Sequence, residues 1–74
     1  TITRAEFTAL VVRALELDII KDRKSFKDVK QEEWYADYIQ TAADAGLVTG
    51  YAGEFRPQDT ITREEMAVVI VRAY

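Results

Sequence analysis

The heptapeptide TITRAEF (residues 1–7) opens the chain, and TITREEM (residues 60–66) repeats it 59 positions later. The similarity continues for eight more residues, so that eight of fifteen aligned positions are identical. In each copy a threonine, Thr3 or Thr62, precedes a glutamate, Glu6 or Glu65, by three residues, which is the spacing of a capping box at a helix N-terminus. The repeat therefore predicts two equivalent helices at the ends of the chain and a modular architecture.

Apolar residues recur at helical spacing after both capping boxes. They are Phe7, Leu10, Val11, Ala14 and Leu15 in the first copy, and Met66, Val69, Ile70, Ala73 and Tyr74 in the second. Residues 66–71 are apolar without interruption, so we expect this helix to need cover on more than one side.

A third helix is predicted between the two copies. Gln31, Glu32 and Glu33 place acids at its N-terminal end, and Gly46 follows at the position of a left-handed C-terminal residue. Its expected apolar stripe is Trp34, Tyr35, Tyr38, Ile39 and Ala42. Phe26 and Val29 are the expected anchors of the loop before it, and the glycine-containing loop after it is expected to be extended, with at most a minimal β-hairpin. The predicted fold is all-α, a small helix-loop-helix-loop-helix unit.

Composition narrows the possible functions of this chain of 74 residues. The net charge is −3, which does not favour binding to nucleic acid or to an anionic membrane. The sequence contains neither cysteine nor histidine, which excludes thiol and histidine catalysis and ordinary zinc sites. No carboxylates stand in a recognisable acid–base pair, and no apolar run approaches the roughly 20 residues of a membrane span. We therefore expect no catalytic residue, metal, cofactor or membrane insertion.

From Phe26 to Tyr74 the sequence resembles an S-layer homology (SLH) domain. The matching residues are Phe26, Asp28, Val29, Trp34, Ile39, Gly46, Gly50, Tyr51, Phe55, Pro57 and the signature Ile61-Thr62-Arg63-x-Glu65. The resemblance divides the chain into residues 1–17, the closing helix of a preceding motif, and residues 18–74, one complete motif, which together form one compact unit. The loop GYAGEF (residues 50–55) is shorter than the family pattern and lacks its aspartate.

The resemblance implies a non-catalytic function at the bacterial cell surface. SLH domains bind secondary cell-wall polysaccharide, often pyruvylated, and thereby attach S-layer and other extracellular proteins to the cell wall. They typically occur as three motifs in a pseudo-threefold bundle. We therefore expect this chain to form a homo-oligomer, a trimer first, or to pack with further SLH motifs of a longer chain. The alternative function is a protein–protein or self-assembly module without a glycan ligand.

Arg4 and Arg63 are the first candidates for polysaccharide binding, because both occupy the first helical turn, where a cation opposes the helix dipole. A bound carboxylate would explain why an arginine stands at this unfavourable position in both copies. The alternative is that Glu6, Glu64 or Glu65 neutralises them.

The remaining candidate ligand residues each have a structural alternative. Trp34 and Tyr51 could stack on sugars, but core packing is favoured for Trp34, and both roles stay open for Tyr51. Asp28 is more readily explained as a turn-former than as a sugar ligand. Glu65 and Gly50 complete the candidate set through the family resemblance.

Overall fold

The computed structural model describes residues 2–21, 26–50 and 53–73 and shows three helices. They are α1 (Arg4–Ala14), α2 (Ala36–Asp44) and α3 (Arg63–Ala73). Within these residues, β pairing consists of isolated bridges such as the antiparallel one between Thr3 and Thr60, and no strand forms. The all-α prediction is confirmed, and the described part of the chain contains no hairpin strands.

The two repeated segments form helices with the same boundaries, since α3 begins and ends 59 residues after α1. Both capping boxes are present. The Thr3 hydroxyl accepts from Glu6 N at 3.1 Å while the Glu6 carboxylate accepts from Thr3 N at 2.8 Å. Thr62 and Glu65 make the equivalent pair of bonds at 3.1 and 2.9 Å. Each box satisfies backbone donors that a helix N-terminus leaves without a partner.

The predicted start of the middle helix is wrong, because Trp34 and Tyr35 precede α2. The segment before α2 consists of tight turns, in which Glu33 N donates to Lys30 O and Ala36 N donates to Glu33 O. These three-residue bonds turn the chain before the regular α-helical pattern begins. The predicted left-handed residue after the helix is confirmed, since Gly46 has φ of 78°.

The hydrophobic core lies mainly between α1, α2 and the loops around them. Its buried members are Ala5, Phe7, Val12, Val29, Tyr35, Ala36, Ile39, Ala42, Leu47, Val48, Phe55, Ile61 and Val69. Both predicted loop anchors are confirmed: Val29 is buried, and the partly buried Phe26 ring lies 5.3 Å from that of Phe55.

Helix α1 buries only part of the face that its apolar pattern predicts, since Phe7 is buried but Leu10 is not. Leu10 is 57% exposed, whereas the short side chains of Thr8 and Ala9 are buried. Thr8 satisfies its hydroxyl by donating to Arg4 O at 2.7 Å, so that it can lie in the core without an unpaired polar group. Helix α1 therefore buries two short side chains beside Phe7 and Val12 and leaves a leucine on its outer side.

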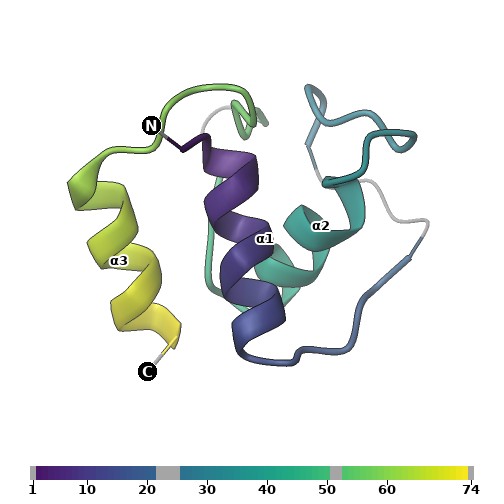
Figure 1. Cartoon of the computed structure of the whole chain (residues 1–74). Helices are drawn as coiled ribbons and strands as arrows, with labels where there is room; N and C mark the ends of the chain where they lie inside the picture. The colour runs from purple at the N-terminus through teal and green to yellow at the C-terminus, as the bar shows by residue number, and fades with distance from the viewer. Residues whose placement is uncertain (1, 22–25, 51–52, 74) are drawn as a thin grey trace.

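The loop from Gly53 to Ile61 crosses the N-terminal end of α1 and leads into α3, which stands beside α1 (Figure 1). Arg4 N and Ala5 N donate to the carbonyls of Asp59 and Pro57, at 2.8 and 3.0 Å. The loop thus caps the first turn of α1 with main-chain acceptors. No helix in the described ranges is long and apolar enough to cross a membrane.

Candidate functional site

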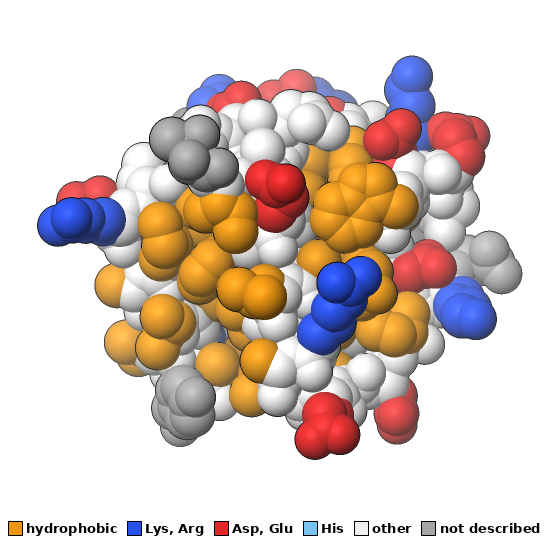
Figure 2. Space-filling view, viewed as in Figure 1, with side chains coloured by type: hydrophobic (Ala, Val, Ile, Leu, Met, Phe, Trp, Pro, Cys, Tyr) orange, Lys and Arg blue, Asp and Glu red, His pale blue; other side chains and the backbone are white. Residues whose placement is uncertain are grey.

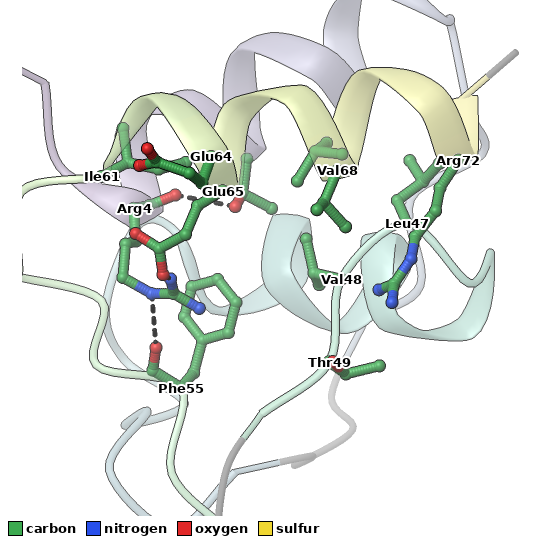
Figure 3. A pocket seen from close by; sticks show the side chains of 12 residues that line it. Arg4, Leu47, Val48, Thr49, Phe55, Ile61, Glu64, Glu65, Val68 and Arg72 are labelled. Atoms are coloured by element: carbon green, nitrogen blue, oxygen red, sulfur yellow. Dashed lines mark hydrogen bonds and ion pairs between the residues drawn. The ribbon is translucent and has the colours of Figure 1, made fainter.

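Arg4 stands at the centre of the candidate site and connects three parts of the chain. Its Nε donates to the Phe55 carbonyl at 2.9 Å, and its guanidinium carbon lies 4.8 Å from the centroid of the Phe55 ring. Its Nη1 forms an ion pair with the Glu65 carboxylate, which comes from the first turn of α3 (Figure 3). One guanidinium therefore joins α1, the 53–61 loop and α3.

The position of the Phe55 carbonyl depends on Asp28. The two carboxylate oxygens of Asp28 accept from Phe55 N and Arg56 N, each at 2.8 Å. Arg56 has φ of 60°, which is a left-handed backbone conformation that residues other than glycine rarely adopt. Charge-assisted bonds to two successive amides stabilise this turn. Asp28 thus has a structural role, but it stabilises a turn 27 residues further along the chain and not the turn in its own segment that the sequence predicted.

Burial and neighbouring charges both act on the Arg4 guanidinium. Desolvation lowers the pKa of Arg4, with a smaller contribution in the same direction from Arg56, while the nearby Asp59 and Asp28 carboxylates oppose the shift. An arginine keeps its charge at neutral pH even so. The site therefore holds a permanent cation that has lost part of its hydration.

A polar cleft opens beside Arg4, and we call it the Arg4 cleft. It has a volume of about 660 Å³. The lining residues are Arg4, Thr49, Gly50, Glu54, Phe55, Arg56, Asp59, Thr60, Thr62 and Glu65. An arginine side chain carries five N–H donors, and the Phe55 and Glu65 contacts account for two of them. Among the described residues, Arg4 consequently keeps donors that can bind an oxygen ligand in the cleft.

A second, more apolar cleft of about 240 Å³ lies between α3 and residues 47–49 (Figure 3). It shares Arg4, Thr49, Phe55 and Glu65 with the Arg4 cleft. It adds apolar side chains, among them Leu47, Val68 and Val69. The two openings meet at Arg4. Because charged residues and threonines take the place of the apolar side chains in its lining, the Arg4 cleft is the better candidate for a polar ligand.

The structure brings together only part of the residue set that the sequence predicted. Arg4, Glu65 and Gly50 line the Arg4 cleft, and Asp28 supports its wall. Glu65 neutralises Arg4, as the alternative interpretation of the arginines proposed, although the glutamate comes from the other copy of the repeat.

The other three predicted residues lie elsewhere or are not described. Arg63 is exposed and lines neither cleft, and Tyr51 lies outside the described residues. The prediction that Trp34 packs in the core is wrong, because its side chain is 56% exposed. The ring makes edge contacts with those of Tyr35 and Tyr38. The cause is the later start of α2, which removes Trp34 from the helical stripe.

Sequence reasoning missed Arg56, Thr49 and Asp59 as members of the cleft. Arg56 stands between Phe55 and Pro57, two residues that match the family pattern, and this position could have indicated it. Its left-handed backbone could not be predicted, because glycine is the residue type that marks such a conformation in a sequence. Thr49 and Asp59 are separated in sequence, and only the path of the loop across α1 brings them to one cleft.

The arrangement is suited to binding rather than to a covalent step. The cleft offers cations, carboxylates, hydroxyls and backbone groups, all of which can form hydrogen bonds with a polar ligand. Across residues 2–21, 26–50 and 53–73, no three acidic side chains form a group that could hold a metal ion.

Comparison with known proteins gives the same family as the motif. A family model described as the S-layer homology domain matches residues 25–67. An amylopullulanase of Thermoanaerobacterium thermosulfurigenes is 46% identical over 74 residues, which are 100% of this chain and 4% of the relative. Exoglucanase XynX of Acetivibrio thermocellus is 45% identical over 74 residues, 100% of this chain and 7% of the relative. S-layer protein sap of Bacillus anthracis is 39% identical over 74 residues, 99% of this chain and 9% of the relative. The chain thus spans less than a tenth of the length of these relatives.

Proposed function

Because the chain belongs to the S-layer homology domain family, we propose that it is a non-catalytic module that anchors a protein to the bacterial cell wall. Relatives include an S-layer protein and a middle cell wall protein, which places modules of this family at the cell surface. The ligand we propose is secondary cell-wall polysaccharide bearing acidic groups, of which a pyruvate ketal carboxylate is the best fit. Residues 1–17 then close a preceding motif and residues 18–74 form a complete one.

The observation that carries this proposal is the partly buried Arg4 with unused donors at the edge of a polar cleft. A planar guanidinium can meet a carboxylate through two parallel hydrogen bonds. Partial removal from water strengthens such a bond relative to one on an open surface. The contacts to Phe55 and Glu65 hold the guanidinium in place before the ligand arrives, which reduces the entropy lost on binding.

The acidic residues of the cleft are compatible with a sugar that carries both hydroxyls and a carboxylate. Glu65 is already paired with Arg4, and Glu54 lies 3.9 Å from Lys27 Nζ. Asp59 and the remaining carboxylate oxygens can accept hydroxyl protons from the sugar ring. Arg56 lies in the same cleft and adds a second cation for the acidic group.

The experiment is a calorimetric titration with purified cell-wall polysaccharide, in its native form and after removal of pyruvyl groups. We expect Arg4→Lys to weaken binding of the native polymer about 10- to 100-fold, because an ammonium cannot reproduce the bidentate geometry. Arg56→Gln should weaken it less. The matched control is Arg13→Gln, which removes the same charge from an exposed site where arginine packs on Tyr38 instead.

Two results would contradict this assignment. Equal losses for Arg56→Gln and Arg13→Gln would indicate a general effect of net charge rather than a site. Undiminished binding after the pyruvyl groups are removed would exclude the ketal carboxylate as the recognised group. A thermal melt of each variant separates lost binding from lost folding.

The second candidate function is a protein–protein or self-assembly module without a glycan. The observation in its favour is the exposed apolar surface of α3, where Val68, Ile70 and Val71 are 47%, 47% and 74% exposed. Light scattering without sugar tests it, because self-assembly requires an oligomer under those conditions. The homotrimer expected from the sequence stays a prediction until that measurement.

A further inference from the structure

The apolar cleft between α3 and residues 47–49 ends at the guanidinium of Arg4 (Figure 3). Leu47 and Val48 line it on one side and are 4% and 7% exposed, so the core holds them in place. Val68 lines it on the α3 side and is 47% exposed. Figure 2 shows that hydrophobic side chains gather over the region where Figure 1 places α3. A ligand that fills the cleft would therefore remove apolar surface from water.

Charged side chains decide where an acidic ligand lies in this cleft. Arg4 is held in place by its bond to the Phe55 carbonyl and by its stacking on the Phe55 ring. Arg72 also belongs to the lining but is exposed, as is Glu64. A cation that is already fixed loses less entropy on binding than an exposed one. A ligand carboxylate therefore binds at the Arg4 end, and a group attached to the neighbouring carbon atom lies at the mouth of the apolar cleft.

We propose that the apolar cleft selects acids in which the carbon next to the carboxylate carries an alkyl group. A cyclic ketal of a 2-oxo acid has this structure, because its carboxylate, its alkyl group and both sugar oxygens are attached to one carbon. The carboxylate binds Arg4, and the alkyl group enters the cleft between Val48 and Val68. A uronic acid has the same charge but no alkyl group at that carbon. The inference rests on the proposed binding of an acidic sugar and adds the residues that decide which acid is recognised.

The volume of the cleft exceeds what a pyruvate ketal fills. A methyl group is similar in size to a water molecule, whose share of the liquid is about 30 Å³, whereas the cleft has a volume of about 240 Å³. A methyl group would leave much of the apolar lining uncovered, and a longer alkyl group would contact more of it. Each further buried carbon should strengthen binding about fourfold, from the transfer of one methylene group out of water. The cleft should therefore prefer ketals with longer alkyl groups to a pyruvate ketal.

The test uses three methyl hexopyranosides that differ in one group. Each carries a cyclic acetal or ketal of a 2-oxo acid in the same configuration, made from glyoxylate, pyruvate or 2-oxobutanoate. Hydrogen, methyl or ethyl then stands beside the same carboxylate. Each compound is measured by calorimetry as a competitor of the native cell-wall polysaccharide. We expect the pyruvate compound to bind about four times as tightly as the glyoxylate compound, and the 2-oxobutanoate compound about four times as tightly again.

Val68→Thr tests the wall of the cleft, because it replaces a methyl group of an exposed side chain by a hydroxyl and leaves the core unchanged. It should reduce the difference between the glyoxylate and 2-oxobutanoate compounds by about threefold or more. The glyoxylate compound should bind as it does to the parent. Val71→Thr is the matched control, because Val71 is exposed on the same helix and lines neither cleft. Arg4→Lys should weaken all three compounds alike, because they share the carboxylate.

The outcomes separate this inference from the proposed function. Equal binding of the three compounds, with Arg4→Lys still weakening all of them, would overturn the inference and leave the proposed function standing. The same change in Val71→Thr as in Val68→Thr would also overturn it, because the effect would then come from the surface of α3 in general. So would a polysaccharide that binds without competition from any of the three compounds. A polysaccharide that does not bind at all would refute the proposed function and this inference with it. The comparison of the three compounds on the parent needs no variant, so it decides the matter even if a substitution affects folding.

Discussion

The clearest prediction compares the same substitution at the two repeated arginines. Arg4→Lys and Arg63→Lys change the same atoms at the same position of equivalent helices and keep the net charge. Arg4 has three contacts that a lysine cannot reproduce together, whereas Arg63 is exposed and has no side-chain partner among the described residues. A difference in stability between the two variants therefore measures those contacts.

The magnitude follows from the contacts of Arg4. The partly buried bond from Nε to the Phe55 carbonyl has a charged donor and contributes about 1.5–3 kcal/mol. The ion pair with Glu65, whose side chain is 38% exposed, adds at most about 1 kcal/mol because water screens it. Stacking on the Phe55 ring adds about 0.5–1 kcal/mol. Because lysine keeps its charge and can form one of these contacts, we expect Arg4→Lys to cost about 1.5–3 kcal/mol.

Urea unfolding is the assay, with the free energy of unfolding compared only where the slope against urea is unchanged. Arg63→Lys should lie within about 0.5 kcal/mol of the parent, since it alters an exposed side chain away from any contact. Equal losses for both variants, or no loss for Arg4→Lys, would refute the role assigned to Arg4. A double-mutant cycle with Glu65→Gln, which keeps the capping box, should give a coupling of about 1 kcal/mol or less.

Four further changes test other parts of the structure. Gly50→Ala should destabilise the fold in a thermal melt, because the added methyl group would lie 2.6 Å from the Glu54 carbonyl oxygen. Asp28→Ala should cost about 2–4 kcal/mol in urea unfolding through two lost charge-assisted bonds, with Asp28→Asn intermediate. Thr62→Ala should cost about 1 kcal/mol through the lost helix cap, and a loss below about 0.3 kcal/mol would contradict it. The hydrogen bond from the Thr3 backbone N–H, and after it the bond with the Thr3 side chain, lowers the pKa of Glu6. The contribution of Glu6 to stability should therefore be complete above pH ~4.3 and disappear as the pH falls through the folded pKa. Thermal melts from pH 6 to 3 should show this loss in the parent and not in Glu6→Gln.

Features that depend on neighbouring residues were predictable from the sequence. Both capping boxes, the left-handed Gly46 and the equivalent bounds of α1 and α3 follow from residues within a few positions of each other. Hydrogen bonds over three residues are encoded locally, so residue type and spacing suffice to predict them. The all-α class followed from the same local patterns.

Features that depend on the path of the chain were not predictable in the same way. The acceptor of Arg4 is a main-chain carbonyl 51 residues away, and any residue type at position 55 supplies a carbonyl. The buried face of α1 contains Thr8 and Ala9 as well as Phe7 and Val12, and a search for large apolar residues overlooks the two short side chains. Trp34 was assigned to a helical stripe, but the turns before α2 place it outside that helix.

The carboxylate of Glu65 connects the start of α3 with the Arg4 cleft. Its Oε1 accepts from Thr62 N and so fixes the start of α3, while its Oε2 contacts Arg4 at the start of α1. Anything that moves the first turn of α3 therefore also changes the guanidinium that lines the Arg4 cleft. The capping glutamate therefore has two structural roles, since it caps the start of α3 and forms an ion pair with the arginine in the first turn of α1.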